Sequence, residues 1–155
     1  MMSQDLEPPL PAAMSLDRGP IGAYEAYNEE AFRHFMTIEC KRAERSHRSL
    51  LLLLVELEAN SHGQRGITPS VASGLFTGLT LCLREIDFMG WYRSGRVIGG
   101  ILIQGADAPA LHISRALTER IAKVLCESVP SQERSRVNVR VLQLRSTSMN
   151  PYEQL

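Results

Sequence analysis

An arginine and an aspartate three positions apart, Arg84 and Asp87, carry the clearest chemical potential in this sequence. An arginine can donate two parallel hydrogen bonds to the O6 and N7 edge of guanine or to a phosphate. A neighbouring carboxylate can accept from the N1–H and N2–H₂ groups of the base. We expect the pair at a helix end, where positions i and i+3 lie on the same side. The pattern predicts either a nucleotide contact or a surface ion pair worth less than about 1 kcal/mol.

Two glutamates, Glu56 and Glu58, close an apolar segment that begins at Leu50. Carboxylate oxygens are suitable ligands for hard divalent cations, so Glu56 is a weak candidate for a metal contact. The alternative interpretation is that both glutamates lie at a solvated strand end. The four histidines and three cysteines do not have the spacing of a metal motif, so no other metal site is predicted.

Charge and composition exclude several classes of protein. The 17 Lys and Arg residues balance the 17 Asp and Glu residues, which argues against a non-specific nucleic-acid binder. The first residues carry acids and prolines where a signal peptide has a basic and then an apolar segment. The longest apolar run, Leu50–Val55, is too short to span a bilayer, and the scattered cysteines fit buried thiols in a reducing compartment. We therefore expect a cytoplasmic protein with no cofactor and no nucleic-acid or membrane partner.

Hydrophobic spacing predicts the elements that must position these residues. A helix is predicted over 24–48, followed by a wholly apolar central strand, 49–57, covered on both faces. The apolar stripe of the helix consists of Tyr27, Ala31, Phe35 and Ile38. Thr68-Pro69 is a typical helix start, and apolar residues three and four positions apart extend this second helix to Ile86.

The remaining segments complete an α+β pattern. Two strands are predicted over 87–92 and 96–103, and a tight turn joins them. Asp107 can cap a third helix. Apolar and polar residues alternate over 137–144, as is typical of a half-buried strand. The order α, β, α, β-hairpin, α, β predicts a mixed central β-sheet flanked by helices. The expected limits are 1–22 for a disordered or loosely docked tail, 23–146 for the domain and 147–155 for a C-terminal tail.

Residues 24–144 resemble the GGDEF domain of the diguanylate cyclase family. The resemblance rests on a helix ending in Arg-Ala-Glu-Arg at 42–45, an apolar strand ending in acid-x-acid at 56–58, and Arg-x-x-Asp at 84–87. It implies a GGDEF or palm-like fold and a role in bacterial signal transduction.

The family's signature hairpin, Gly-Gly-Asp/Glu-Glu-Phe, begins five residues after Asp87, where this chain reads Arg93-Ser94-Gly95-Arg96-Val97. In the family the glycines let the turn approach bound GTP, and the acids help to hold divalent metal. An arginine in such a position repels the metal, by roughly 4 kcal/mol per unit charge at about 4 Å. The guanine-contacting loop of the family is matched only by Asn60 and His62-Gly63. We therefore expect a degenerate domain without catalytic residues.

In this family the Arg-x-x-Asp motif forms an inhibitory product site for cyclic di-GMP (c-di-GMP), which also uses an arginine from the helix after the hairpin. The resemblance implies such a site at Arg84, Asp87 and Arg115. We expect a non-catalytic signalling domain that binds c-di-GMP and acts on a protein partner, with a homodimer left open. The alternatives are a weakly active diguanylate cyclase, and a protein-interaction domain that binds no nucleotide.

Overall fold

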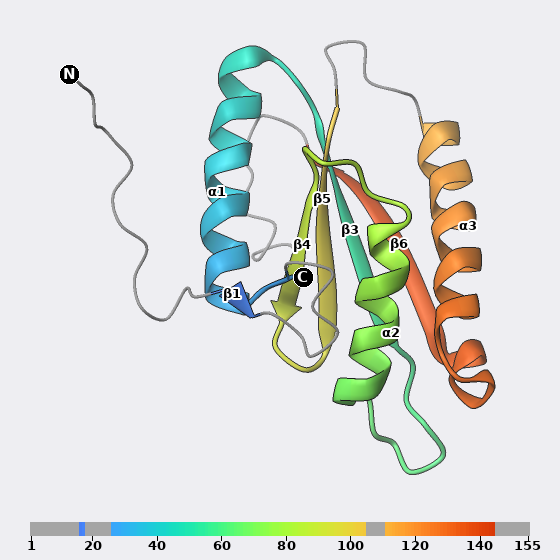
Figure 1. The fold of residues 1–155 in the computed structure, drawn as a ribbon. Coiled ribbons are helices and arrows are strands. Elements are labelled where there is room, and N and C mark those ends of the chain that lie inside the picture. Colours follow the sequence, from blue (N-terminus) through green and yellow to red (C-terminus); the bar gives the residue numbers. More distant parts are fainter. Residues whose placement is uncertain (1–15, 18–25, 105–110, 145–155) are drawn as a thin grey trace.

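The computed structural model describes residues 16–17, 26–104 and 111–144, whose strands form one mixed sheet (Figure 1). The elements are β1 (Leu16–Asp17), β2 (Ala26–Tyr27), α1 (Glu29–Ser46), β3 (Leu50–Leu57), α2 (Pro69–Thr80), β4 (Phe88–Arg93), β5 (Val97–Ile103), α3 (Leu111–Ser128), the 3₁₀ helix η2 (Ser131–Arg136) and β6 (Val137–Leu144). The strand order is β1-β2-β4-β5-β3-β6, with β2 parallel to β4 and the other pairs antiparallel. The predicted α+β class with a mixed, helix-flanked sheet is confirmed.

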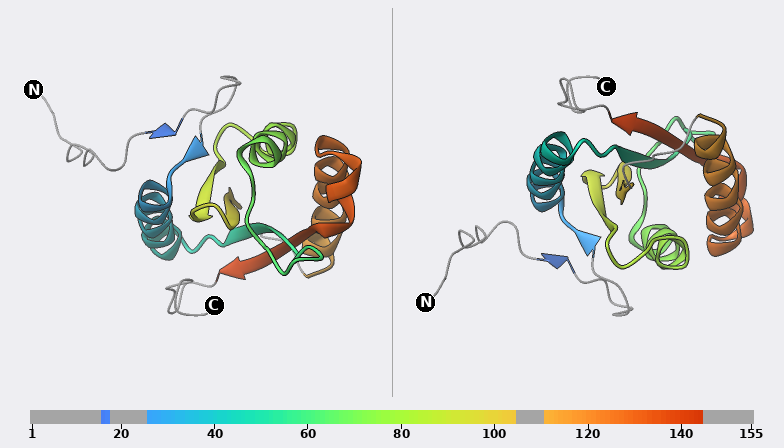
Figure 2. Two further views of the ribbon diagram at one scale, coloured as in Figure 1. Left: turned by 90° about the horizontal axis from the view of Figure 1, so that it is seen from below. Right: turned by 90° about the horizontal axis from the view of Figure 1, so that it is seen from above.

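The leucine-rich strand β3 lies inside the sheet, between β5 and β6. Leu50, Leu52 and Leu54 belong to the apolar core on the side of α1. Alternate residues, including Leu51 and Leu53, join the core under α2 and α3. Figure 2 shows α1 on one face of the sheet and α2 with α3 on the other. The prediction of a central strand covered on both faces is therefore confirmed.

Helix α1 begins later than its sequence pattern predicted. Ala26 and Tyr27 form β2, with Tyr27 opposite Gly90 of β4. Asn28 is the N-cap, because its side-chain oxygen accepts the Ala31 N–H at 2.8 Å. The buried residues of the helix are Ala31, Phe32, Met36 and Ala43. The predicted stripe shares only Ala31 with these buried residues, so its placement through Phe35 and Ile38 was wrong by part of a turn.

Helix α2 ends at Thr80, so the predicted continuation to Ile86 was wrong. Its start is as predicted, with Thr68 as N-cap and Pro69 in the first turn. After Thr80 the chain passes through consecutive turns, which leave the side chain of Leu81 77% exposed and that of Ile86 57% exposed. Arg84 and Asp87 therefore lie in a turn before β4 and not on a helix.

Two glycines allow close packing around the sheet. A Cβ at Gly78 would lie 2.9 Å from Leu125 Cδ2 and 2.5 Å from Ser128 Oγ, so α2 approaches α3 closely at this point. A Cβ at Gly99 would lie 2.8 Å from the ring of Phe32, so β5 approaches α1. These close contacts lie on the two faces of the sheet, between α2 and α3 on one face and between β5 and α1 on the other.

Some predicted features lie outside the described residues: the cap at Asp107, the C-terminal tail and nearly all of the N-terminal tail. Within that tail, Leu16–Asp17 is described and pairs with β2. Among the helices of the described residues, none combines the length and apolarity that a membrane span requires.

Candidate ligand-binding site

Arg84 and Asp87 close a turn through side-chain and backbone hydrogen bonds. The Asp87 N–H donates to the Arg84 carbonyl at 3.0 Å. The Asp87 carboxylate accepts from the Arg84 backbone N–H at 2.9 Å and from its Nε and Nη2 at 3.3 and 3.2 Å. The structure thus brings the two predicted residues together, as an ion pair within a turn.

The same turn is attached to the end of β5. Asp87 Oδ1 accepts the Ile103 N–H at 3.1 Å, and Arg84 Nη2 donates to the Ile103 carbonyl. The Asp87 side chain is only 1% exposed, whereas that of Arg84 is 57% exposed. Asp87 is therefore a buried acceptor, and Arg84 is the member of the pair that faces solvent.

A pocket of about 380 Å³ lies beside this turn, against the ends of β3 and β5 and one face of α3. We call it the α3 pocket. The residues that line it are Leu51, Cys82, Arg84, Asp87, Leu102, Gln104, Ala116, Leu117 and Arg120. A larger hollow of about 680 Å³ lies on the other side of the turn and includes Tyr27, Phe35 and Phe88 in its lining. Arg84 and Asp87 both contribute to the lining of these two spaces.

The second arginine of the α3 pocket is Arg120, which the sequence analysis did not identify. Arg115, the predicted residue, is exposed on α3 and is not among the described residues that line the pocket. Five residues on an α-helix correspond to about 140° of rotation, so the two arginines point in different directions. The spacing of Ala116, Leu117 and Arg120 could have indicated a shared helix face.

The cysteine thiols are free and partly buried. Burial raises the pKa of Cys82, and the nearby positive charge of Arg120 opposes that rise. Burial is also the main reason why the pKa of Cys40 is raised. Cys82 lies in the turn after α2, whereas the sequence placed it in a helix. Its raised pKa makes it a neutral, mainly apolar part of the wall of the α3 pocket at neutral pH.

The paired glutamates lie at the opposite end of the sheet. Arg140 Nη2 on β6 donates to Glu56 Oε2 at 3.3 Å, and Glu58 is exposed. No cluster of three or more His, Cys, Asp or Glu side chains that could hold a metal ion occurs in the described residues. Glu58 is therefore solvated at the end of the strand, in agreement with the alternative interpretation of the sequence. Glu56 instead forms an ion pair with Arg140.

The turn between β4 and β5 is fixed on both sides. The Ser94 N–H donates to Glu29 Oε1 on α1 at 2.6 Å, and the Gly95 carbonyl accepts the Ile67 N–H at 2.8 Å. Gly95 has a φ of 73°, which favours glycine.

Tyr92 and Trp91 point to opposite faces of β4, as expected for adjacent strand residues. Burial raises the pKa of the Tyr92 hydroxyl.

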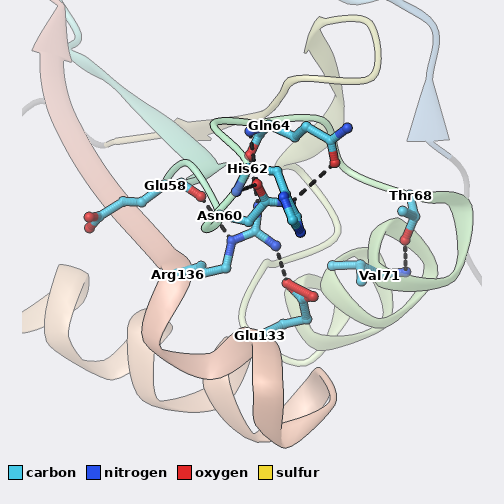
Figure 3. Close-up of polar contacts among 8 residues, drawn as sticks. All are labelled: Glu58, Asn60, His62, Gln64, Thr68, Val71, Glu133 and Arg136. Carbon is cyan, nitrogen blue, oxygen red and sulfur yellow. Dashed lines mark hydrogen bonds and ion pairs between the residues drawn. The ribbon is translucent and has the colours of Figure 1, made fainter.

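The loop after β3 folds on itself and is held by Arg136 (Figure 3). The side-chain oxygen of Asn60 accepts the N–H groups of His62 and Gln64 at 2.8 and 2.9 Å. Arg136 donates to the carbonyls of Glu58 and Gln64 at 2.9 and 3.2 Å and also contacts the Glu133 carboxylate. Asn60 therefore uses its side-chain oxygen within its own loop.

Comparison with known proteins gives matches among solved structures only. No family model and no curated protein sequence matches the chain. The GGDEF domain of DgcB from Caulobacter crescentus, in complex with c-di-GMP, superposes with a TM-score of 0.58 at 14% identity, over 92% of this chain and 83% of that chain. A sensory box/GGDEF family protein from the same organism gives 0.58 at 18% identity, over 82% of each chain.

The chain has a GGDEF-like fold. A third similar structure is the diguanylate cyclase SiaD from Pseudomonas aeruginosa in complex with its activator SiaC. Its TM-score is 0.57 at 18% identity, over 82% of this chain and 49% of that one. In this GGDEF-like domain residues 93–97, which the sequence resemblance aligns with the family's signature, form the end of β4, the turn and the start of β5. They lie at the same end of the sheet as Glu56, whereas Arg84 and Asp87 lie at the other end (Figure 1).

Proposed function

We propose that this chain is a non-catalytic GGDEF-like signalling domain that binds c-di-GMP in the α3 pocket. The observation that carries the proposal is that Arg84 and Arg120 approach one apolar-walled pocket from two different elements. Guanidinium groups form bidentate contacts with phosphates and with the guanine edge. The apolar walls, which include Leu102 and Leu117, suit the face of a purine ring. The complex of the DgcB GGDEF domain with c-di-GMP supports this class of ligand.

Arg84 is oriented for binding before a ligand arrives. Its Nε and Nη2 atoms bond to Asp87 and the Ile103 carbonyl, while Nη1 makes no hydrogen bond within the described part of the chain. Ordering an arginine side chain costs up to about 2 kcal/mol of rotamer entropy. Because the hydrogen bonds of the turn already order Arg84, ligand binding loses less of this entropy. Arg84 is therefore the residue that we expect to contribute most to affinity.

Arg115 has a smaller role in this proposal. It lies one turn of α3 before the arginine that lines the pocket, and it is exposed to solvent. We propose that it attracts the ligand's phosphates from outside the pocket. Salt screens such exposed contacts, so the contribution of Arg115 should fall as ionic strength rises.

The proposal excludes catalysis because of the charges at the opposite end of the sheet. Arg96 is exposed in the position of a signature acid, and Glu56 is paired with Arg140. The positive charge of Arg140 beside the Glu56 carboxylate makes the binding of a divalent metal less favourable, and Arg96 precedes Val97, the strand partner of Glu56. The turn that would approach GTP is also fixed to Glu29 and Ile67.

We further propose that the domain acts in the cytoplasm of a bacterium and passes its ligand state to a protein partner. The exposed apolar side chains of Leu81 and Ile86, next to the Arg84 turn, support a protein contact there. SiaD was solved with its activator protein, which shows that at least one protein of this fold has such a partner.

Titration of c-di-GMP into the purified chain, followed by calorimetry and thermal melting, tests the proposed function. We expect a dissociation constant in the micromolar range and a rise in melting temperature on binding. If tens of micromolar c-di-GMP give neither heat nor a melting shift, the domain is not a receptor, and the interaction-domain alternative replaces it.

A further inference from the structure

The carboxylate of Asp87 is fully used within the protein. Oδ1 accepts from Ile103 N and Arg84 Nη2 at 3.1 and 3.2 Å, and Oδ2 accepts from Arg84 N and Nε at 2.9 and 3.3 Å. An ionised carboxylate has about four acceptor positions, so these four donors satisfy it. With its side chain 1% exposed, Asp87 has neither the access nor the free lone pairs to accept hydrogen bonds from a base.

The other side chains of the α3 pocket offer few acceptors for the N1–H and N2–H₂ groups of guanine. Among the described residues that line it, Asp87 is the only carboxylate. Arg84 and Arg120 can only donate, so they suit a phosphate or the O6 and N7 edge of guanine, and they cannot select guanine while they hold the phosphates. Gln104 also lines the pocket, and its amide both donates and accepts. Such an amide can pair with adenine N6 and N7 as well as with a guanine edge.

We propose that the α3 pocket is a cyclic-dinucleotide site with weak discrimination between guanine and adenine. In this site Arg84 and Arg120 hold the phosphates, Gln104 contacts the base, and Asp87 is a positioning residue that fixes Arg84. This inference rests on the proposed function, but it changes the ligand class from c-di-GMP alone to cyclic purine dinucleotides in general. The site therefore differs from one in which a carboxylate reads guanine.

Calorimetric titration with c-di-GMP and cyclic di-AMP in the same buffer tests the inference. We expect the two dissociation constants to differ by less than about fivefold, because a bidentate contact that distinguishes the bases would give about five- to hundredfold. A preference for c-di-GMP of about fivefold or more would overturn the weak discrimination and leave the proposed function standing. Binding of neither ligand would overturn both.

An Asp87→Asn variant separates positioning from direct contact. If Asp87 acts through Arg84, both dissociation constants rise by the same factor, and their ratio stays within about threefold of the original. Loss of c-di-GMP affinity alone would show that Asp87 contacts guanine and would overturn the inference. Because the ratio is measured on folded protein, a general loss of stability does not imitate either result.

A Gln104→Glu variant tests the assignment of the base contact without relying on Asp87. A carboxylate at this position can accept from both the N1–H and N2–H₂ groups of guanine, but only from the N6–H₂ group of adenine, whose neighbouring ring nitrogens are acceptors. We therefore expect the affinity ratio to move at least about fivefold toward c-di-GMP. Gln132→Glu, on the exposed 3₁₀ helix η2, adds the same charge away from the pocket and should leave the ratio unchanged. An unchanged ratio in the Gln104 variant would overturn the role of Gln104.

Discussion

Arg140 and Glu56 form an ion pair between neighbouring strands, with Nη2 and Oε2 3.3 Å apart. Their side chains are 44% and 27% exposed, so the pair contributes at most about 1 kcal/mol to stability. Its larger effect is electrostatic, because it places a positive charge beside the carboxylate best suited to hold a metal.

The first prediction concerns catalysis. We expect no formation of c-di-GMP from GTP with Mg²⁺ or Mn²⁺, because Glu56 is paired with Arg140 and the sequence resemblance places Arg96 where the family has a signature acid. Chromatography of the reaction mixture measures the product, and the Glu56→Ala variant is the control. Product above the level of that control would show that the domain is a cyclase.

The second prediction concerns the central strand. Leu52→Asp or Leu53→Asp should unfold the domain, because both side chains are 0% exposed and neither has a partner for a charge. Leu81→Asp is the matched control, since its side chain is 77% exposed and the change should stay within about 0.5 kcal/mol. Circular dichroism during heating measures the effect, and normal melting of both core variants would contradict the buried position of β3.

The third prediction concerns the arginines and c-di-GMP. Arg84→Ala and Arg120→Ala should each weaken binding by about ten- to hundredfold, because a hydrogen bond to a charged group contributes about 1.5–3 kcal/mol. Arg115→Ala should have a smaller effect, and that effect should decrease at high salt. Arg65→Ala removes an exposed arginine at the other end of the sheet and should bind normally. Calorimetry measures the dissociation constants for c-di-GMP. Equal values for all four variants would contradict binding in the α3 pocket.

The fourth prediction concerns the stability of the Arg84 turn. Asp87→Ala leaves the Ile103 N–H without its acceptor, so we expect a loss of about 1–3 kcal/mol in the free energy of unfolding. Glu85→Ala, an exposed change within the same turn, should cost less than about 0.5 kcal/mol. Urea unfolding measures both values. Equal stability of the two variants would mean that Asp87 does not anchor the turn to β5.

The fifth prediction concerns the contact between α2 and α3. Gly78→Ala adds a methyl group 2.9 Å from Leu125 Cδ2 and 2.5 Å from Ser128 Oγ. We expect this overpacking to cost about 1–3 kcal/mol, although alanine is the better helix former. Thr77→Ala, exposed on the same helix, is the control for propensity. A stabilised Gly78 variant would show that the helices can separate without cost.

The sequence was sufficient to predict the four longer strands, β3 to β6, because these depend on short-range patterns. The two-residue strands β1 and β2, which pair with each other and with β4, were not predicted. An apolar run such as 50–55 can be satisfied only between two layers, and Thr68-Pro69 starts a helix by local geometry. The end of α2 could not be predicted in this way. Leu83 and Ile86 continue the apolar spacing, but Asp87 bonds to Ile103, sixteen residues away, and this tertiary contact replaces the last helical turn.

The site could be predicted only in part for the same reason. Arg84 and Asp87 are close in sequence, so their pairing follows from local spacing. The choice between Arg115 and Arg120 depends on the rotation of α3 about its axis. That rotation is set by which residues, such as Ile121 and Leu125, are buried against the sheet. Asp87 is turned toward the protein because it accepts the Ile103 N–H at the end of β5. The sequence around Asp87 does not indicate this long-range contact.

The position of β6 has a consequence for folding in the cell. During synthesis the apolar strand β3 leaves the ribosome early, but its partners β5 and β6 follow much later, with β6 the last described element. Until then both edges of a leucine-rich strand are unpaired, which is the condition that favours association between nascent chains. Such non-local pairing also slows folding. Among the described strands, β6 is therefore the last to be made, and it covers the second edge of the leucine-rich strand β3.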